Sequence, residues 1–593
     1  MSKRLVIAAL FAAMLMPFSP PAHAAETVDE VMSAVVTRLY AEKSPEELAA
    51  LDEETVRGLF TGKDREILAN RYWTFDVDVP VVVSVMRDRA QETVPFWLGE
   101  GGFKKTDLRV RNSEYQYEVW RKEFPAGRVG LGINGFDKNR PHYFVAVGPQ
   151  KKGARVKVTP VFPEKQQLLA MKKGATIYHD WPDLVLTTVP KELEGQVLLP
   201  TIRGRAREAH LLGGFRLTKH PAATAPDQVM LTWSGDPQTT QTIQWRAAET
   251  VAEGVVRYRE KDGVWAEAAA EVRRVEDRNL ANDRYVNRFT ATLTGLRPGT
   301  EYEYVVRAGA EESAPAVFKT APAGDTPFSF VWMSDTHCSP ESGELLAAAG
   351  QRHPEASFLV VSGDLVGTGQ YRDDWDKLFS NFAPFIKSRP FMPSIGNHDA
   401  IDGLGAELYL SLFELPKNGP PATGPEQSYR FQYGNTLILS LDVTAPLEPQ
   451  AEWIEETLRA SNATWKIAVL HFPPYFPDES DMEVRRAWCG IFEKNHVDLV
   501  LSGHTHNYVR TKPLHGGKPV VDPKDGTIYL VTVSVPGRPV PNRTEEFTEY
   551  VDFSGKPFYH LFTVDGETLV SRSMDLEGKI CDELVLKKPG KVN

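Results

Sequence analysis

Cysteine is scarce in this 593-residue sequence, which contains only Cys338, Cys489 and Cys581. An odd number of cysteines allows at most one disulfide within the chain, so no disulfide framework holds the fold together. Cys489 and Cys581 are one conceivable pair in an oxidising compartment, and buried free thiols are the favoured state. We interpret Cys338 as a small buried residue.

A surplus of positive charge is also missing, because 68 Lys and Arg residues face 79 Asp and Glu residues, for a formal net charge of −11. Such an acidic chain repels polyanions, which argues against binding of nucleic acid or anionic membranes through bulk charge. Small phosphorylated substrates stay compatible with it where the site supplies its own cations. The hydrophobic share of 42% and the charged share of 25% are typical of a globular protein and argue against a disordered or fibrous one.

Long apolar runs are absent as well. The apolar stretch over residues 5–16 follows two basic residues and is too short to span a bilayer. A proline-rich segment with small residues at 22 and 24 comes next, which suits cleavage before Ala25. Residues 1–24 are therefore predicted to be a secretory signal peptide, which implies a periplasmic or secreted protein without a membrane anchor. An uncleaved membrane anchor is the alternative.

The length predicts about two to four domains, since one domain typically takes ~100–200 residues. Residues 25–220 begin with helical patterns, among them the capping sequence Ser44-Pro45-Glu46-Glu47, and continue from residue 73 with short β-type runs. No catalytic motif is found there. We predict an α+β accessory domain of unknown role.

Residues 221–322 alternate apolar and polar residues in several short strands, for example at 229–233, and contain the turn Leu-Arg-Pro-Gly-Thr at 296–300. This spacing predicts an all-β sandwich of the fibronectin III type. In residues 323–593 apolar β-branched runs alternate instead with helical segments. That change predicts a C-terminal α/β domain with sheets flanked by helices.

Five apolar runs of the α/β domain each end at a short polar motif. The motifs are Asp335-Thr-His337, Gly-Asp364, Gly-Asn397-His398-Asp399, His471 and Gly-His504-Thr-His506. Because the carboxyl ends of neighbouring strands in an α/β sheet face one crevice, these side chains are expected to meet there. A mixed set of imidazole, carboxylate and amide ligands without thiolate suits two divalent transition ions, Fe, Mn or Zn, better than calcium. Two such ions close together can bind both the attacking hydroxide and the phosphoryl oxygens.

In this order the five motifs resemble the signature of the calcineurin-like metallophosphoesterases, with a close resemblance over residues 325–575. The resemblance implies one metal held by Asp335, His337, Asp364 and His506, and a second held by Asp364, Asn397, His471 and His504, with Asp364 bridging. It also implies that the catalytic residue His398 lies beside the substrate, where it stabilises phosphate charge or protonates the leaving oxygen.

Other phrases are similar to the purple acid phosphatase branch, namely residues 428–435, 471–475 and 503–508, together with the preceding sandwich phrase at 294–304. Two departures stand out. That branch has a tyrosine ligand where this chain has Gly367, and its first motif normally lacks the histidine that His337 supplies. An imidazole would therefore replace a phenolate, so Fe³⁺ and its tyrosinate colour are not expected.

Residues 472–483 contain no histidine that could act as a second acid, so His398 is expected to act alone. Four further residues are candidates for the substrate pocket: Tyr475, Tyr508, Asp399 and Asp402. Asp442 also ends an apolar run, and we interpret it as a structural residue.

The sequence thus predicts an exported metal-dependent phosphoric ester hydrolase that acts on phosphomonoesters, in the manner of an acid phosphatase. A phosphodiesterase or nucleotidase that uses the same site is the first alternative, because the loops around such a site choose the substrate. An envelope-polymer or partner-binding protein with a subsidiary phosphoesterase domain is the alternative of another class. The oligomeric state is not predicted.

Overall fold

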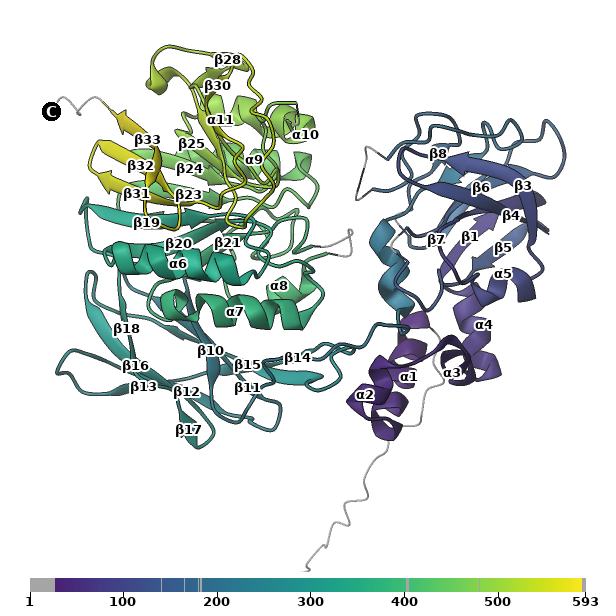
Figure 1. The fold of residues 1–593 in the computed structure, drawn as a ribbon, viewed down its shortest axis with the longest axis horizontal. Helices are drawn as coiled ribbons and strands as arrows, with labels where there is room; N and C mark the ends of the chain where they lie inside the picture. Colours follow the sequence, from purple (N-terminus) through teal and green to yellow (C-terminus); the bar gives the residue numbers. More distant parts are fainter. Residues whose placement is uncertain are drawn as a thin grey trace, which may run out of the picture.

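The computed structural model describes residues 27–139, 141–164, 166–179, 181, 184–400, 405–478 and 480–588. The predicted signal peptide and Asp402 lie outside the described residues. Figure 1 shows a smaller N-terminal part, in purple and blue, beside a larger part that carries the sandwich and the C-terminal domain. Within the described ranges, no helix is both long and apolar enough to cross a membrane.

Four helices open the N-terminal part, and each begins at a polar side chain that accepts a hydrogen bond from the first turn. They are α1 (Val28–Glu42), α2 (Pro45–Ala49), α3 (Glu53–Gly58) and α4 (Gly62–Asn70). At Ser44 the side chain accepts from the Glu47 N–H, and the Glu47 carboxylate accepts from the Ser44 N–H. Val31, Val35 and Leu39 bury one face of α1, so packing of an apolar stripe stabilises this helix.

Two antiparallel sheets follow, in the strand orders β5-β1-β7 and β3-β4-β2-β6-β9-β8. The elements are β1 (Trp73–Val77), β2 (Val81–Asp88), α5 (Phe96–Glu100), β3 (Lys104–Arg111), β4 (Gln116–Phe124), β5 (Gly127–Leu131), β6 (Phe144–Pro149), β7 (Val158–Phe162), β8 (Leu169–Ala170) and β9 (Val197–Leu199). Trp73, Val83 and Val129 belong to one buried core that joins the two sheets. The 3₁₀ helix η1 (Arg203–Ala209) leads from this part to the sandwich.

The sandwich consists of two antiparallel sheets, β10-β11-β15-β14 and β13-β12-β16-β17, with β18 paired to β16. The strands are β10 (Asp227–Thr232), β11 (Gln241–Ala248), β12 (Gly254–Glu260), β13 (Ala266–Ala269), β14 (Glu271–Glu276), β15 (Tyr285–Leu293), β16 (Glu301–Ala308), β17 (Glu311–Glu312) and β18 (Ala316–Lys319). Trp245 stacks on Phe289 in its core, with ring centroids 5.4 Å apart. Trp233, by contrast, packs against Phe358 of the C-terminal domain, so the sandwich and that domain share a hydrophobic core.

The C-terminal domain contains two mixed sheets, β21-β20-β19-β31-β32-β33 and β22-β23-β24-β25-β29-β26-β30. The first sheet is built from β19 (Phe328–Met333), β20 (Ala356–Ser362), β21 (Phe391–Ser394), β31 (Tyr559–Asp565), β32 (Thr568–Met574) and β33 (Ile580–Lys587). The second is built from β22 (Tyr429–Tyr433), β23 (Thr436–Ser440), β24 (Trp465–Val469), β25 (Leu499–Ser502), β26 (Tyr508–Thr511), β29 (Ile528–Val531) and β30 (Thr548–Asp552); a separate hairpin joins β27 (Leu514–His515) to β28 (Lys518–Pro519).

Helices cover the outer faces of both sheets, as Figure 1 shows. Those of the domain are α6 (Pro340–Arg352), α7 (Arg372–Ile386), α8 (Glu407–Leu412), α9 (Ala451–Ala460), α10 (Met482–Val484) and α11 (Gly490–Lys494). α7 lies between the first sheet and the sandwich and packs against β10. The predicted multidomain class, with a sandwich before an α/β domain of two sheets flanked by helices, is confirmed.

All three cysteines are free, with Cys338 and Cys489 buried and Cys581 partly exposed. The conceivable bridge between Cys489 and Cys581 is therefore not formed. Burial raises the pKa of the Cys489 thiol to about 12, so this residue behaves as a buried apolar group rather than as a nucleophile.

Candidate metal centre

Five strand ends supply the predicted ligands. β19, β20 and β21 are parallel to one another in the first sheet, and β24 and β25 are parallel in the second. Asp335, Asp364, His471 and His504 each follow their strand by two residues, and Asn397 follows β21 by three. The parallel order therefore delivers these side chains to one end of the two sheets, as the sequence predicted.

The first group of ligand atoms comes from Asp335, His337, Asp364 and His506, and all four lie within 4.8 Å of one another. Nε2 of His506 is 3.3 Å from Oδ1 of Asp335 and 3.1 Å from Nε2 of His337. Nε2 of His337 is 3.8 Å from Oδ2 of Asp364. Ligand atoms this close together can surround one metal ion.

Asp364, His471 and His504 form the second group within the same distance limit. Nε2 of His471 is 3.2 Å from Oδ2 of Asp364 and 3.1 Å from Oδ1 of Asn397. The other ring nitrogen, Nδ1–H, donates to the carbonyl of Ser362 at 2.9 Å, which leaves Nε2 as the ligand atom. Asp364 is common to both groups.

The backbone at this centre lies in the left-handed region at residues that carry side chains. The φ angles are 51° at Asp335, 43° at His337, 51° at Asp364, 74° at His504 and 54° at His506. Such conformations cost of order 1–3 kcal/mol each and persist where the surrounding structure enforces them. Their concentration at five ligand positions indicates that the fold is built around this site.

Charge balance tests whether the site fits metal ions. Asp335 and Asp364 are fully buried, and within the described ranges neither carboxylate pairs with Lys or Arg. Burial alone would raise the pKa of Asp364, but the His471 imidazole holds it well below its usual range. Burial likewise disfavours protonated His471, yet the Asp364 carboxylate raises the pKa of His471 to about 9. Two buried carboxylates that rely on imidazole protons for compensation fit a site that takes divalent cations.

His398 lies beside the ligands without joining either group. Its backbone N–H donates to Oδ1 of Asp364 at 2.9 Å, and its Nδ1–H donates to the carbonyl of Gly367 at 2.9 Å. Nε2 is 4.0 Å from Oδ2 of Asp364, and the side chain is 38% exposed. This arrangement leaves Nε2 free to exchange a proton with a bound molecule.

Three predicted pocket residues lie elsewhere. Tyr475 is 1% exposed and packs on the Tyr529 and Phe547 rings, and Tyr508 is 1% exposed and donates to Oδ2 of Asp582 at 2.7 Å. Both tyrosines are turned into the core next to a polar motif, so neither lines a pocket. Asp399 is also buried, and Asp402 lies outside the described residues.

Asp399 instead fastens two ligand loops together. Its carboxylate accepts from the N–H groups of Leu365, Val366 and Gly396. This role was not predicted from the sequence, although an acid directly after Asn-His is a local signal for it. Phe472 was missed as well, and its ring lies 4.7 Å from that of the ligand His504.

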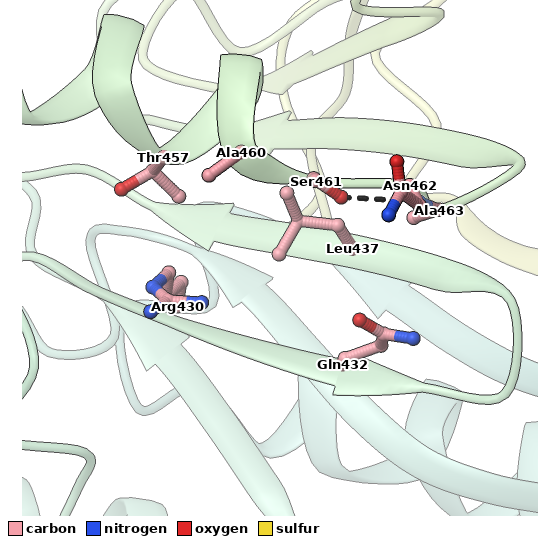
Figure 2. Close-up of a pocket in the computed structure, with 8 residues that line it drawn as sticks. All are labelled: Arg430, Gln432, Leu437, Thr457, Ala460, Ser461, Asn462 and Ala463. Carbon is pink, nitrogen blue, oxygen red and sulfur yellow. Dashed lines mark hydrogen bonds between the residues drawn. The ribbon is translucent and has the colours of Figure 1, made fainter.

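A surface groove of about 350 Å³ opens between β22, β23 and α9 and is shown in Figure 2. Arg430, Gln432, Leu437 and Asn462 are among its lining residues. None of the metal-centre residues lines it, so this groove is separate from the chemistry at the strand ends.

Comparison with known families identifies two of the domains. Residues 328–508 match the calcineurin-like phosphoesterase family, and residues 226–320 match the N-terminal domain of purple acid phosphatases. The chain thus combines a calcineurin-like phosphoesterase domain with a purple acid phosphatase N-terminal domain. It is accordingly a metal-dependent phosphoesterase hydrolase, as predicted, and the Asp and His groups above are its candidate metal ligands.

Relatives of this metallophosphoesterase occur in bacteria and plants. An uncharacterized protein of Mycobacterium tuberculosis is 25% identical over 361 residues, which cover 51% of this chain and 68% of the relative. The Fe(3+)-Zn(2+) purple acid phosphatase 12 of Arabidopsis thaliana is 21% identical over 319 residues, 49% of this chain and 66% of the relative. The purple acid phosphatase from yellow lupin seeds shares the fold, with a TM-score of 0.54 at 15% identity over 87% of this chain and 93% of that one.

Proposed function

We propose that this protein is an exported phosphoesterase with a dinuclear metal centre that hydrolyses phosphomonoesters. The observation that carries the proposal is the position of Asp364, whose carboxylate belongs to both ligand groups. A carboxylate shared in this way brings two cations close together. Two divalent ions held there would activate a water molecule and neutralise the phosphoryl oxygens of the substrate.

The residues of the chain supply the remaining steps. Asn397, His471 and His504 would complete one metal site with Asp364, and Asp335, His337 and His506 the other. His398 would give its Nε2 proton to the leaving oxygen as the P–O bond breaks, because this nitrogen is the exposed one and the other is committed to Gly367. General acid catalysis of this kind contributes typically ~10²–10⁴-fold.

Zn, Mn or Fe in the divalent state are the proposed ions. The relative named for Fe(3+) and Zn(2+) is a purple acid phosphatase. The resemblance to that branch implies a tyrosine ligand at the position where this chain has Gly367. Glycine offers no phenolate oxygen to stabilise Fe³⁺, while His337 offers an imidazole, which suits borderline divalent ions. The purified protein is therefore expected to be colourless.

Export is proposed from the basic residues, the apolar stretch and the small residues of the first 24 positions. The partner is a small phosphorylated molecule rather than nucleic acid or a membrane, because the net charge of −11 repels bulk polyanions.

Elemental mass spectrometry and aryl phosphate hydrolysis test the proposal on wild type, Asp364→Asn and the control Asp565→Asn, which lies at the exposed end of β31. The expected result is about two transition ions per chain and faster turnover of p-nitrophenyl phosphate than of its bis-aryl diester, both retained in the control. Asp364→Asn should lose metal and turnover together. A wild-type protein that stays inactive after addition of Mn²⁺, Fe²⁺ and Zn²⁺ would refute the proposal. Faster turnover of the bis-aryl diester than of the monoester would show that phosphodiesters are the substrate class.

A further inference from the structure

The loop of residues 367–371 holds the backbone and ring of His398. The Gly367 carbonyl accepts from Nδ1–H at 2.9 Å, and the Gly369 N–H donates to the His398 carbonyl at 2.8 Å. Gly369 lies so close to the Asp399 backbone that a Cβ on Gly369 would be 1.8 Å from the Asp399 carbonyl oxygen. The direction of Nε2 is therefore set by where this loop lies.

The far end of the loop begins helix α7 and is capped by another domain. Tyr371 stands at the N-cap and makes no side-chain capping bond. The Arg372 N–H donates instead to Oδ2 of Asp277 at 3.0 Å, and Asp277 belongs to the sandwich region between β14 and β15. A carboxylate at this position satisfies a free N–H and interacts favourably with the helix dipole.

Arg216, from the segment before the sandwich, fastens the same turn from a second side. Its guanidinium donates to Asp277 and, through Nε, to Oδ1 of Asp373 at 2.9 Å. It also lies over the Tyr371 ring, 3.7 Å from the centroid. The Arg216 side chain is 17% exposed, so these charged bonds are made with little competition from water.

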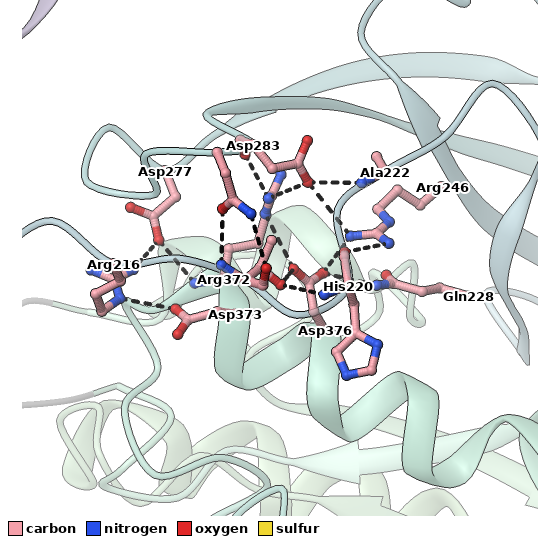
Figure 3. A network of polar contacts seen from close by, with 12 residues as sticks. Arg216, His220, Ala222, Gln228, Arg246, Asp277, Asp283, Arg372, Asp373 and Asp376 are labelled. Carbon is pink, nitrogen blue, oxygen red and sulfur yellow. Dashed lines mark hydrogen bonds and ion pairs between the residues drawn. The ribbon is translucent and has the colours of Figure 1, made fainter. Parts of the chain in front are cut away.

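Further ion pairs join α7 to the sandwich, as Figure 3 shows. Arg372 donates to Oδ2 of Asp283 at 2.7 Å, and Arg246 of β11 donates to Oδ1 of Asp376 at 2.8 Å. Both arginines are 1% exposed. The first turns of α7 are thus held by the sandwich at several buried points, and Arg216 with Asp277 is the point nearest the loop.

We propose that Arg216 and Asp277 are positioning residues for His398, which they hold in place through the loop of residues 367–371. The inference rests on the proposed role of His398 as proton donor. It assigns the sandwich and the segment before it a part in catalysis, although neither contributes a ligand to the metal centre. A misplacement of about 1 Å can cost ~10²-fold in rate.

Proton donation matters most for a poor leaving group, so the test compares phenyl phosphate with 2,4-dinitrophenyl phosphate. Arg216→Ala in the full chain is expected to lower kcat for phenyl phosphate by ~10–100-fold and kcat for the dinitrophenyl ester by less than ~3-fold. KM and the metal content should stay unchanged. Arg216→Lys keeps the charge but loses the planar guanidinium with its several donors. Its kcat for phenyl phosphate should lie between those of wild type and Arg216→Ala.

Arg259→Ala is the matched control, because Arg259 pairs with Glu303 within the sandwich and should leave both rates unchanged. In a His398→Ala background, Arg216→Ala should add no further loss for phenyl phosphate. Hydrogen exchange of residues 364–372 should rise in Arg216→Ala and not in the control. If Arg216→Ala does not fold, Asp373→Asn is the second variant, because it weakens the bond from Arg216 Nε to Asp373. It should give a smaller loss of kcat for phenyl phosphate and again little change for the dinitrophenyl ester.

Equal losses for both esters, additive losses with His398→Ala, or unchanged hydrogen exchange would each overturn the inference. A His398→Ala protein with wild-type turnover of phenyl phosphate would instead refute the proton-donor role itself. In that case unchanged hydrogen exchange in Arg216→Ala would show that Arg216 does not hold the loop of residues 367–371 either. Raised hydrogen exchange would confirm that Arg216 holds this loop, without a role in proton donation.

Discussion

Gly396→Ala tests the metal centre with a single methyl group. A Cβ at this position would lie 2.2 Å from the Asp364 N and 2.3 Å from its Oδ1. The carboxylate that both ligand groups share must then retreat by about 0.7 Å, since real contacts are not closer than 3.0 Å. Metal–ligand distances are expected within about ±0.2 Å of their usual values, so both metal sites are expected to weaken together.

The expected size is a loss of at least ~100-fold in turnover, because a displacement near 1 Å at a reacting centre costs about that much. Elemental mass spectrometry after dialysis should find well under two ions per chain in Gly396→Ala. Gly490→Ala is the control, since a Cβ at Gly490, at the start of α11, meets nothing within 4 Å. A Gly396→Ala protein with full metal content and turnover would refute the close approach, and with it the shared-ligand geometry.

Three further predictions concern stability. Asp442 is fully buried, its Oδ2 has no hydrogen-bond partner among the described residues, and burial raises the pKa of this carboxyl to about 6. A raised folded-state pKa means that stability is lost as pH rises, so Asp442→Asn should match wild type at pH 4 and exceed it by about 2–3 kcal/mol at pH 7.5 in urea unfolding. Equal stability of the two proteins at both pH values would contradict this. Asp376→Ala removes the 2.8 Å partner of Arg246 Nη1, while Asp227 still pairs with Nε and Nη2 of the same side chain. The expected cost is that of a buried donor left unsatisfied, ~1–3 kcal/mol by the same measurement. A loss under ~0.5 kcal/mol would contradict a stabilising role for this ion pair. Removal of metal by a chelator should lower the unfolding midpoint, with recovery on adding Zn²⁺ or Mn²⁺, because Asp335 and Asp364 lose their counter-cations; an unchanged midpoint would argue against bound ions.

The convergence of the candidate ligands was predictable because each of them follows an apolar strand at short distance. That rule is local, and parallel pairing of β19 to β21 and of β24 with β25 turns it into spatial convergence. The rule is also incomplete. Asp442 follows β23 by two residues, as His471 follows β24, yet its Oδ1 accepts from the Thr444 N–H and hydroxyl and it joins no ligand group.

The tyrosine predictions were wrong for a related reason. Tyr475 and Tyr508 stand next to ligand motifs in sequence, but nearness in sequence does not fix the direction of a side chain, and within a strand successive side chains point to opposite faces. Packing decided the outcome: Tyr475 meets Tyr529 and Phe547, and Tyr508 meets Asp582 from β33. None of these partners is near in sequence, so local patterns carried no information about them.

By itself the sequence determined the order of the domains, the mixed nitrogen and oxygen chemistry of the candidate centre and which side chains would meet there. These depend on periodicity, turn residues and residue type, which act over a few positions. The tertiary structure alone decided how His398 is held. Arg216, Asp277 and Asp373 lie on three separate segments, and ion pairs between such segments form only when the sandwich packs on α7. The free energy of those contacts depends on burial, and burial is a property of the assembled fold.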